Sequence, residues 1–409
     1  MTRNNYLLCF LLFAFSLLFQ ASTYASADST LQLSSDAKAS ILTMGPGSSL
    51  VDAFGHSAIR IEDTRRGIDV VYNYGVYDFD TPNFYLKFAR GKLPYLLGVN
   101  RFEDFVRNYK AQNRWIKEQV LALNSQEVND LFQFLQVNAR PENRAYAYDF
   151  FYDNCATKIG EVLYKVAGDQ IQWNLEEQEA DKTFRALIYE NSYWNTWGRV
   201  GMDIALGSVA DRTTTPLEEL FLPDYVFNAF AKADLQTPQG VQPLVQETTT
   251  LNEGPDKAPR GFWLTSPFLV FLLISLLIGY LTWKDNQQDT RNRTLDTCLF
   301  VFTGLIGLGV VLLWFATDHM ATQLNYTLLW AFVLNLFMAP VAAKKEPFVQ
   351  FIAYLKFLLI LLALMVFHWV VGVQQFALAL LPFYIALAIR YFYLLRYFRR
   401  HPLTAPERK

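Results

Sequence analysis

The chain has 409 residues, of which 52% are hydrophobic, 16% aromatic and only 18% charged, with a formal net charge of −2. This length allows two domains, the composition excludes a disordered chain, and the near-neutral charge argues against a nucleic-acid-binding protein. A count of three cysteines excludes a disulfide-rich scaffold. Apolar residues are concentrated in the last third of the chain, whereas most of the preceding part has the composition of a soluble protein.

The N-terminus has the pattern of a secretory signal peptide. A single cation, Arg3, precedes an apolar stretch, and residues 25–27 read Ala-Ser-Ala, a small-x-small cleavage site. Residues 1–27 are therefore predicted to be removed. Cys9 lies inside the apolar stretch and not at the cleavage site, so it is not expected to carry a lipoprotein anchor. An uncleaved N-terminal anchor helix is the alternative, and in both cases the residues that follow are exported.

The rest of the chain divides into an exported domain and a membrane domain. Residues 28–235 are predicted to form the exported domain, and the stretch 236–260, rich in Pro, Gly and Thr, is predicted to be a linker. A transmembrane domain at 261–398 and a cytoplasmic tail at 399–409 follow. Each apolar segment of that domain is long enough to cross a bilayer. The five segments are Phe262–Trp283, Thr297–Thr317, Tyr326–Ala343, Leu355–Val373 and Phe376–Leu394.

Basic residues are found in alternate connections between these segments. They follow the first, third and fifth segments: Lys284, Arg291 and Arg293, then Lys344 and Lys345, then Arg396, Arg399, Arg400 and Arg408. The other two connections contain no Lys or Arg. Because cytoplasmic loops are enriched in cations, the exported domain should face away from the cytoplasm and the C-terminus should lie inside it. The protein is thus predicted to be a multi-pass membrane protein with an exported N-terminal domain and a cytoplasmic C-terminus.

Cysteine and histidine are scarce in the predicted exported domain. Cys9 leaves with the signal peptide and Cys298 lies in the second apolar segment, so Cys155 is the one cysteine of that domain. Of the four histidines in the chain, only His56 belongs to it. Lone cysteines and histidines are commonly structural, but a lone thiol in an oxidising compartment calls for a reason. If the domain uses a thiolate and an imidazole base, the pair must be Cys155 and His56.

Cys155 lies between an aromatic stretch and a predicted helix. The preceding sequence YAYDFFYDN reads as extended chain, and the helix is predicted to end at Gly168. Its apolar face comprises Ile159, Val162, Leu163 and Val166. Asp153 or Asn154 would be the N-cap, which places Cys155 in the first turn. There the helix dipole and unpaired N–H groups favour a thiolate and can help to form an oxyanion hole, with Asn154 as a supporting residue.

His56 follows a glycine-rich turn and directly precedes a short alternating stretch, SAIRIED, that predicts a strand. The sequence IDVVYNYG reads as its antiparallel partner. A polar side chain on that partner strand would orient the imidazole, as the third member of a triad does. Asn73 is the preferred candidate, with Tyr72 and Tyr74 as rivals, because the sequence does not define which side chains share the face of His56.

The segment PNFYLKFARGKLPYLLG, which begins at Pro82, is aromatic, cationic and punctuated by glycine. It is predicted to be either core with a loop or a membrane-proximal lip that admits lipid. The sequence contains neither a phosphate-binding loop nor a clustered His/Cys metal site, so no cofactor or metal is expected.

Six blocks in this order, FGHSAIRI, VYNYG, FARGKLPYLLG, YDFFYDNCATKIGEVL, GMDIALGSVADR and FLPD, precede the apolar segments. Together they resemble the Lnb-type lipoprotein N-acyltransferases and their N-terminal periplasmic domain. The order of His before Cys is also similar to permuted papain-like folds of the NlpC and lecithin:retinol acyltransferase type. The resemblance implies an α+β fold in which a permuted papain-like exported domain precedes an all-α, five-helix transmembrane domain.

The resemblance further implies that Cys155 is the nucleophile and His56 the base. The implied reaction moves a fatty acyl group from a phospholipid donor, through a Cys155 thioester, to the α-amino group of the diacylglyceryl-cysteine of a bacterial lipoprotein. The lipid bilayer would hold both substrates. No nucleic-acid partner is implied.

Two other hypotheses remain open from the sequence. The first is an exported cysteine peptidase or amidase that acts on cell-wall peptides, in which water or a peptide resolves the intermediate. The second is a non-enzymatic membrane sensor or transport partner, for which Asn335, Lys356 and His368 in or near the apolar segments would matter.

Overall fold

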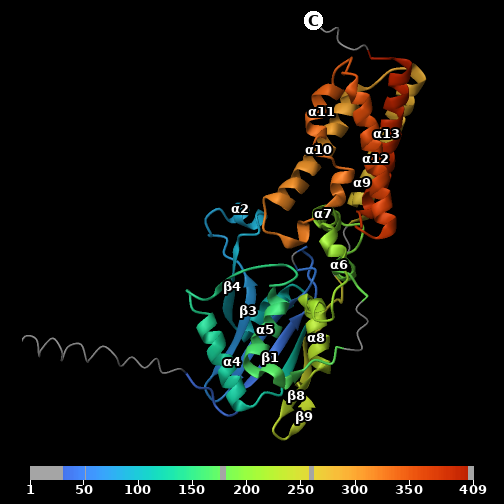
Figure 1. The fold of residues 1–409 in the computed structure, drawn as a ribbon. Helices are drawn as coiled ribbons and strands as arrows, with labels where there is room; N and C mark the ends of the chain where they lie inside the picture. The colour runs from blue at the N-terminus through green and yellow to red at the C-terminus, as the bar shows by residue number, and fades with distance from the viewer. Residues whose placement is uncertain (1–30, 51, 176–180, 258–261, 404–409) are drawn as a thin grey trace, which may run out of the picture.

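The structure is a computed structural model that describes residues 31–50, 52–175, 181–257 and 262–403. The predicted signal peptide lies outside these residues. A domain built around a β-sheet lies at one end of an elongated molecule, and a helical bundle lies at the other (Figure 1). This arrangement of a sheet with helices followed by a helical bundle is an α+β organisation, as expected.

A seven-stranded sheet forms the centre of the first domain, in the order β10-β5-β1-β2-β3-β4-β6. All of its pairs are antiparallel. The strands are β1 (Lys38–Met44), β2 (His56–Asp63), β3 (Ile68–Val76), β4 (Pro94–Arg101), β5 (Ile116–Leu121), β6 (Ala145–Ala147) and β10 (Val245–Asn252). A small second sheet comprises β7 (Ile171–Gln172), β8 (Asp234–Thr237) and β9 (Gly240–Pro243).

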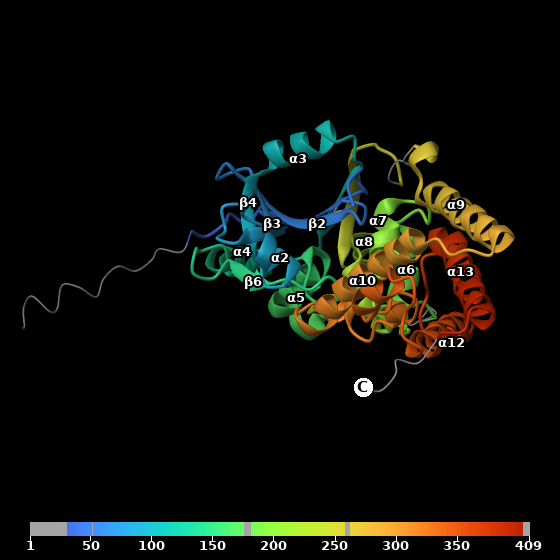
Figure 2. The ribbon, with the colours of Figure 1, turned by 90° about the horizontal axis from the view of Figure 1, so that it is seen from above.

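Helices cover both faces of the large sheet. On one face α4 (Ser125–Asn138), α5 (Cys155–Ala167) and α8 (Pro223–Lys232) enclose the main core, which includes Ile59 of β2. On the other face α3 (Phe102–Ala111) packs on a smaller cluster that includes Ala58 (Figure 2). Because successive side chains of a strand point to opposite faces, this alternation separates the two cores. Asn124 and Glu127 form a capping box at the start of α4.

Three short helices lie on the side of the sheet that faces the bundle (Figure 1). They are α2 (Phe84–Ala89), α6 (Phe184–Glu190) and α7 (Trp197–Ala205). The single-turn 3-10 helices are η1 (Gly168–Gln170), η2 (Ser208–Asp211), η3 (Glu218–Phe221), η4 (Trp263–Thr265), η5 (Met320–Thr322), η6 (Tyr326–Leu329) and η7 (Leu378–Leu380).

The prediction of a linker at 236–260 is wrong over most of that range. Its residues Val245–Asn252 form β10, which pairs with β5 as an edge strand of the large sheet. The Thr-rich run that suggested a flexible linker is also a run of β-branched residues, which fit a pleated surface well. The sheet domain therefore extends to Asn252, and not only to residue 235.

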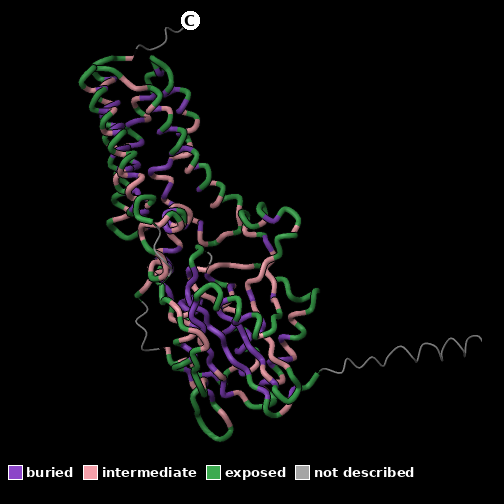
Figure 3. Tube along the Cα trace, turned by 180° about the vertical axis from the view of Figure 1, so that it is seen from behind, coloured by how far each residue is buried: buried purple, intermediate pink, exposed green. Residues whose placement is uncertain are grey.

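Four long helices form most of the bundle: α9 (Pro267–Gln288), α10 (Arg293–Phe315), α12 (Gln350–Val371) and α13 (Leu381–Arg400). In the described part of the chain, these four have the length and apolar composition needed to cross a membrane, α13 together with η7. Their outward surfaces are largely exposed, whereas buried residues line the interior of the bundle (Figure 3). Inside it, Arg390 of α13 forms ion pairs with Asp285 and Asp296, each at 2.7 Å.

The third predicted segment is not a single long helix, so the predicted five-helix transmembrane domain is not confirmed in the described residues, where four helices are long enough to cross a membrane. It consists of η6 and, after a non-helical turn, α11 (Asn335–Ala342). Glycines allow this irregular backbone to approach α10: a Cβ on Gly304 would lie 2.6 Å from the Leu336 nitrogen, and one on Gly307 only 2.1 Å from the Ala331 oxygen. Irregular backbone is tolerated at membrane depth only where protein covers it.

The two domains are joined by contacts beyond their covalent connection. Asp211, which accepts two hydrogen bonds from the fully buried Arg185, also accepts one from the backbone of Gln375 at 3.2 Å. Asn325 donates to the backbone oxygens of Ile204 and Ala205, both at 2.9 Å. These polar contacts fix the sheet domain against one end of the bundle.

Candidate active site

Cys155 is the first residue of α5, as predicted, and Asn154 is its N-cap. The Asn154 side-chain oxygen accepts from the N–H groups of Ala156 and Thr157, at 2.8 and 3.0 Å. Its amide nitrogen donates to the backbone oxygens of Phe150 and Phe221, at 2.7 and 2.9 Å. The Asn154 side chain is thus committed to fixing the helix terminus, so it supports Cys155 and is not aimed at an oxyanion. α5 ends where Gly168 was predicted to stop it.

The aromatic stretch before Cys155 is only partly extended, which corrects the predicted structure of that segment. β6 covers Ala145–Ala147, and a turn follows in which Asp149 accepts from the N–H groups of Phe151 and Tyr152. The ring of Phe151 stacks on Phe184 at 4.3 Å. Asx turns compete with strand pairing, and the buried ring holds this turn in place. The turn therefore positions the start of α5 against the sheet.

His56, the first residue of β2, lies next to Cys155 at the end of the sheet. Gly75 of β3 lies against both: a Cβ added there would be 3.6 Å from the Cys155 Cβ and 3.7 Å from the His56 Cε1. The backbone of Gly75 has φ +94°, and the β3–β4 register shifts between Asn73 and Val76. Glycine adopts this positive φ at little cost. A register shift of this kind, a β-bulge, changes the direction in which the side chains at the end of a strand point.

Asn73, and not Tyr72 or Tyr74, contacts the imidazole. The Asn73 Oδ1 lies 2.5 Å from the His56 Nε2, so the ring donates from Nε2 and Nδ1 remains for Cys155. Tyr72 points to the opposite face of β3, where it is fully buried and accepts a hydrogen bond from Gln136 at 2.9 Å. Tyr74 belongs to the same core. The period-2 alternation of β3 therefore separates Asn73 from its two rivals.

Cys155 and His56 change each other's pKa. Burial opposes the thiolate, but the His56 charge, a hydrogen bond to the His56 ring and the N–H groups of Ser57 and Ala156 lower the pKa of Cys155 overall. Burial also opposes the imidazolium, but the Cys155 charge, the hydrogen bond to Cys155 and the hydrogen bond to Asn73 raise the pKa of His56. A thiolate and an imidazolium are therefore favoured together in the pH range between the two pKa values.

Two residues beside the imidazole were not predicted from the sequence. The ring of Tyr109 in α3 lies parallel to His56, with centroids 6.3 Å apart. The Arg114 guanidinium lies 4.7 Å from the Tyr109 ring and forms an ion pair with Asp52 at 3.2 Å. The positive charge of Arg114 partly opposes the imidazolium. Neither residue belongs to a motif, and only the packing of α3 on the sheet brings them to His56.

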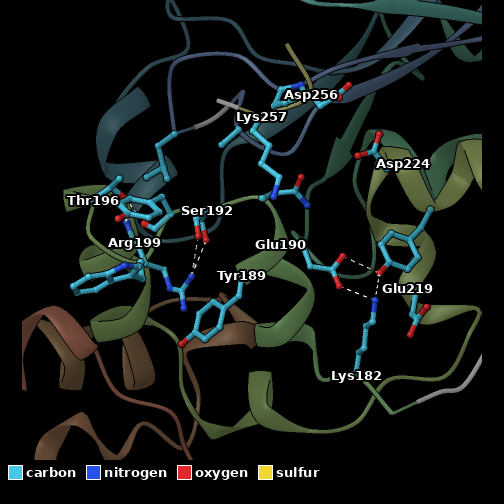
Figure 4. Close-up of a pocket in the computed structure, with 18 of the residues that line it drawn as sticks. Lys182, Tyr189, Glu190, Ser192, Thr196, Arg199, Glu219, Asp224, Asp256 and Lys257 are labelled. Atoms are coloured by element: carbon cyan, nitrogen blue, oxygen red, sulfur yellow. Dashed lines mark hydrogen bonds and ion pairs between the residues drawn. The ribbon is translucent and has the colours of Figure 1, made fainter. Parts of the chain in front are cut away.

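A large cavity lies elsewhere in the molecule. It has a volume of about 1560 Å³ and lies between residues 46–53 and the helices α6, α7 and α8. Two of the cations that line it have partners within the lining: Lys182 forms an ion pair with Glu190 at 2.7 Å, and Arg199 donates to the Ser192 hydroxyl at 3.1 Å (Figure 4). Cys155 and His56 do not line it. Among the residues that the structure describes, no group of His, Cys, Asp and Glu side chains is arranged to hold a metal ion.

Comparison with known protein families gives two matches. Residues 25–190 match the family model described as the Lnb N-terminal periplasmic domain. Residues 259–401 match the one described as the Lnb transmembrane domain. The chain belongs to the Lnb family. The N-terminal Lnb match contains His56, Asn73 and Cys155, and the resemblance predicted from the sequence is confirmed.

Lnb membership also assigns the two structural parts. The sheet domain is the periplasmic domain, and the helical bundle belongs to the membrane. No curated protein and no solved structure matches the chain.

The Asn73 contact leads to a prediction about Cys155 reactivity. In Asn73→Ala the imidazolium loses a hydrogen bond, so the alkylation rate of Cys155 by iodoacetamide near neutral pH should fall about tenfold, as for a pKa change of one unit. Mass spectrometry of the Cys155 peptide across a pH series measures this rate apart from that of Cys298. Asn73→Asp retains an acceptor and should restore the reactivity. An unchanged pH profile in Asn73→Ala would show that Asn73 does not position His56.

Proposed function

We propose that this protein is a membrane-bound, thiol-dependent acyltransferase that N-acylates bacterial lipoproteins. The observation that carries the proposal is the half-buried, hydrogen-bonded pair of Cys155 and His56 at the N-terminus of α5, with Asn73 on the far side of the imidazole. An activated thiolate with an oriented base is the machinery of acyl transfer through a covalent intermediate. Membership of the Lnb family, in both the periplasmic and the membrane part, supports lipoprotein modification as the purpose of that machinery.

In the first step, the Cys155 sulfur attacks the ester carbonyl carbon of a phospholipid acyl chain. The bond between this carbon and the ester oxygen breaks, and the lysophospholipid leaves with a proton from the His56 imidazolium. The acyl group remains on Cys155 as a thioester. The backbone N–H of Cys155, which is not one of the two N–H groups that the Asn154 side chain binds, supplies a donor for the negative charge that develops on the carbonyl oxygen.

In the second step, the α-amino group of a diacylglyceryl-cysteine attacks the thioester carbon. The carbon–sulfur bond breaks, His56 takes the proton of the amine, and an amide forms on the lipoprotein. The Cys155–His56 pair returns to its starting state. A thioester is well suited to this step because it is readily attacked by an amine, and neither step needs a cofactor.

The fold of the periplasmic domain supports the same proposal. A helix with the nucleophile at its first turn packs on an antiparallel sheet, and the base and its amide partner lie on neighbouring strands. We propose that this is a permuted papain-like arrangement, in which His56 precedes Cys155 in the chain. The bundle would lie in the inner membrane with the C-terminus in the cytoplasm, because the loop cations favour that orientation.

The thioester is the species to test. Full-length protein in phospholipid vesicles without an acceptor should accumulate an acyl group on Cys155, detected by mass spectrometry and released by hydroxylamine. Addition of a diacylglyceryl-cysteine lipopeptide should remove this adduct and yield the N-acylated peptide. A peptidase or amidase would instead cleave cell-wall peptides and leave the lipopeptide amine free. The absence of both adduct and N-acyl product would contradict the proposal.

A further inference from the structure

A row of apolar side chains is exposed between β3 and β4. It comprises α2 and the turn before it, where Phe79, Tyr85, Leu86 and Phe88 are exposed by 66%, 80%, 59% and 49%. These residues are neighbours in the fold, since the rings of Phe79 and Phe84 lie 4.8 Å apart and those of Phe84 and Phe88 6.3 Å. A contiguous apolar surface of this kind marks a binding region and is not an accidental feature of a soluble domain. We call these four residues the α2 tip.

The α2 tip lies at the outer end of the membrane domain. The backbone of Asp318, just after α10, donates to the Arg90 oxygen at 2.9 Å, and the His319 Nε2 lies 3.2 Å from the Phe88 oxygen. Figure 1 shows α2 beside the end of α10 that faces the sheet domain. Because α10 ends at Phe315, the exposed rings of α2 lie at the level where α10 leaves the apolar layer.

The surroundings of the α2 tip have the composition of a membrane interface. At the same end of the bundle, Phe315 and Trp263 are exposed by 71% and 67%, and Trp and other aromatic rings are enriched where proteins meet lipid headgroups. Arg90 is exposed, and Lys92 forms an ion pair with Asp318 at 3.5 Å. Cations beside exposed apolar groups suit a surface made of acyl chains with phosphate headgroups above them.

A line of rings connects the α2 tip to the candidate active site. Tyr77, two residues after Gly75, has its ring 5.8 Å from that of Phe84 and 5.7 Å from that of Tyr95. Tyr95 stacks on Tyr148 at 4.1 Å. Gly75 lies against Cys155 and His56, and burial together with the charge of Cys155 raises the pKa of Tyr148. Rings at these spacings are in contact, so the line is continuous from Phe84 to Tyr148, which is close enough to Cys155 to be affected by its charge.

We propose that the α2 tip inserts into the outer leaflet and that the line Phe84, Tyr77, Tyr95 and Tyr148 guides the acyl chain of a phospholipid to Cys155. This inference rests on the proposed acyltransferase function and specifies how its lipid donor reaches the thiol. The ligand is the apolar chain of a bilayer lipid, which a continuous ring surface accommodates without specific hydrogen bonds.

The test compares a bilayer substrate with a soluble one. Tyr85→Ser/Leu86→Ser, in full-length protein, should slow the formation of the Cys155 adduct from vesicle phospholipid about tenfold, because two apolar side chains no longer enter lipid. The Cys155-dependent reaction with p-nitrophenyl acetate, which needs no membrane, should keep its wild-type rate. Val241→Ser is the matched control, since Val241 is 64% exposed on β9, at the opposite end of the sheet domain from the bundle.

Equal rates for the double variant and the wild type on vesicle phospholipid would overturn the role of the α2 tip. A second measurement does not depend on catalysis. In Cys155→Ala protein, a phospholipid with a diazirine in its acyl chain should crosslink to peptides containing Tyr77, Phe84 and Tyr95, and not to the peptide containing Val241. Failure of this crosslink would overturn the lipid route, whereas a crosslink together with a wild-type protein that forms no thioester would contradict the acyltransferase function alone.

Discussion

Cys155→Ser is expected to lower N-acylation of the lipopeptide acceptor at least about a thousandfold, as the loss of the covalent nucleophile does in hydrolytic enzymes that use one. The favourable interactions at this site require a negatively charged sulfur, because the His56 charge and the N–H groups of Ser57 and Ala156 stabilise the Cys155 thiolate. A serine hydroxyl has a far higher pKa than a thiol, so the same surroundings do not ionise it. Mass spectrometry of lipoprotein N-termini, in cells that depend on this protein, measures the loss.

Cys298→Ser is the matched control for this substitution. Cys298 is the other cysteine that the structure describes, and it is exposed on α10 in the bundle, where a hydroxyl can bond to the helix backbone. Its replacement should leave N-acylation at the wild-type level. N-acylation that persists in well-expressed Cys155→Ser protein, at a level similar to that of the control, would refute Cys155 as the nucleophile.

His56→Ala is expected to slow thioester formation about a hundredfold to ten-thousandfold near neutral pH, the usual contribution of a general base. The shape of the pH profile should change as well. In the wild type the rate should rise with pH as Cys155 loses its proton at a lowered pKa, and fall again as the imidazolium loses its proton at a raised pKa. Without the imidazole, the thiolate should form only near the ordinary thiol pKa of about 8.5.

The adduct on Cys155, measured with p-nitrophenyl acetate from acidic to alkaline pH, separates these two profiles. The wild type should show a maximum, and His56→Ala a continuous rise towards alkaline pH. Tyr164→Ala, on the exposed side of α5, is a control that leaves the pair intact. A maximum that survives in His56→Ala at the wild-type position would show that another group supplies the base.

Local sequence patterns were sufficient to predict those parts of the candidate site that depend on residues close together in the chain. Asn154 and Gly168 mark the start and end of α5, because caps depend on residues within one turn. The pairing of the strand that begins at His56 with the one that contains Asn73 follows from a short turn between alternating segments. The choice between Asn73 and the two tyrosines required the pairing register of β3. A shift of one residue in that register exchanges the side chains on the two faces of the sheet.

The errors arose where the structure depends on distant partners. β10 is a strand because β5, more than a hundred residues earlier, offers an edge to its Thr-rich sequence. The third apolar segment has the composition of a span, but Gly304 and Gly307 on α10 provide the room that lets its backbone leave the helix. Hydropathy is calculated over a short window of consecutive residues. Neither β5 nor the two glycines of α10 lie within the window of the segment whose structure they determine.

The position of β10 also bears on how substrates would meet the protein in the proposed reaction. Residues 253–266 connect the last strand of the large sheet to α9, and Asp211 and Asn325 join the two domains again on their facing surfaces. These contacts hold the sheet domain, and with it Cys155, in a fixed position relative to the bundle. In the proposed reaction, the phospholipid donor and the lipoprotein acceptor therefore reach Cys155 by two-dimensional diffusion within the leaflet, and their encounter rate depends on the surface density of lipoprotein, not on its concentration in the periplasm.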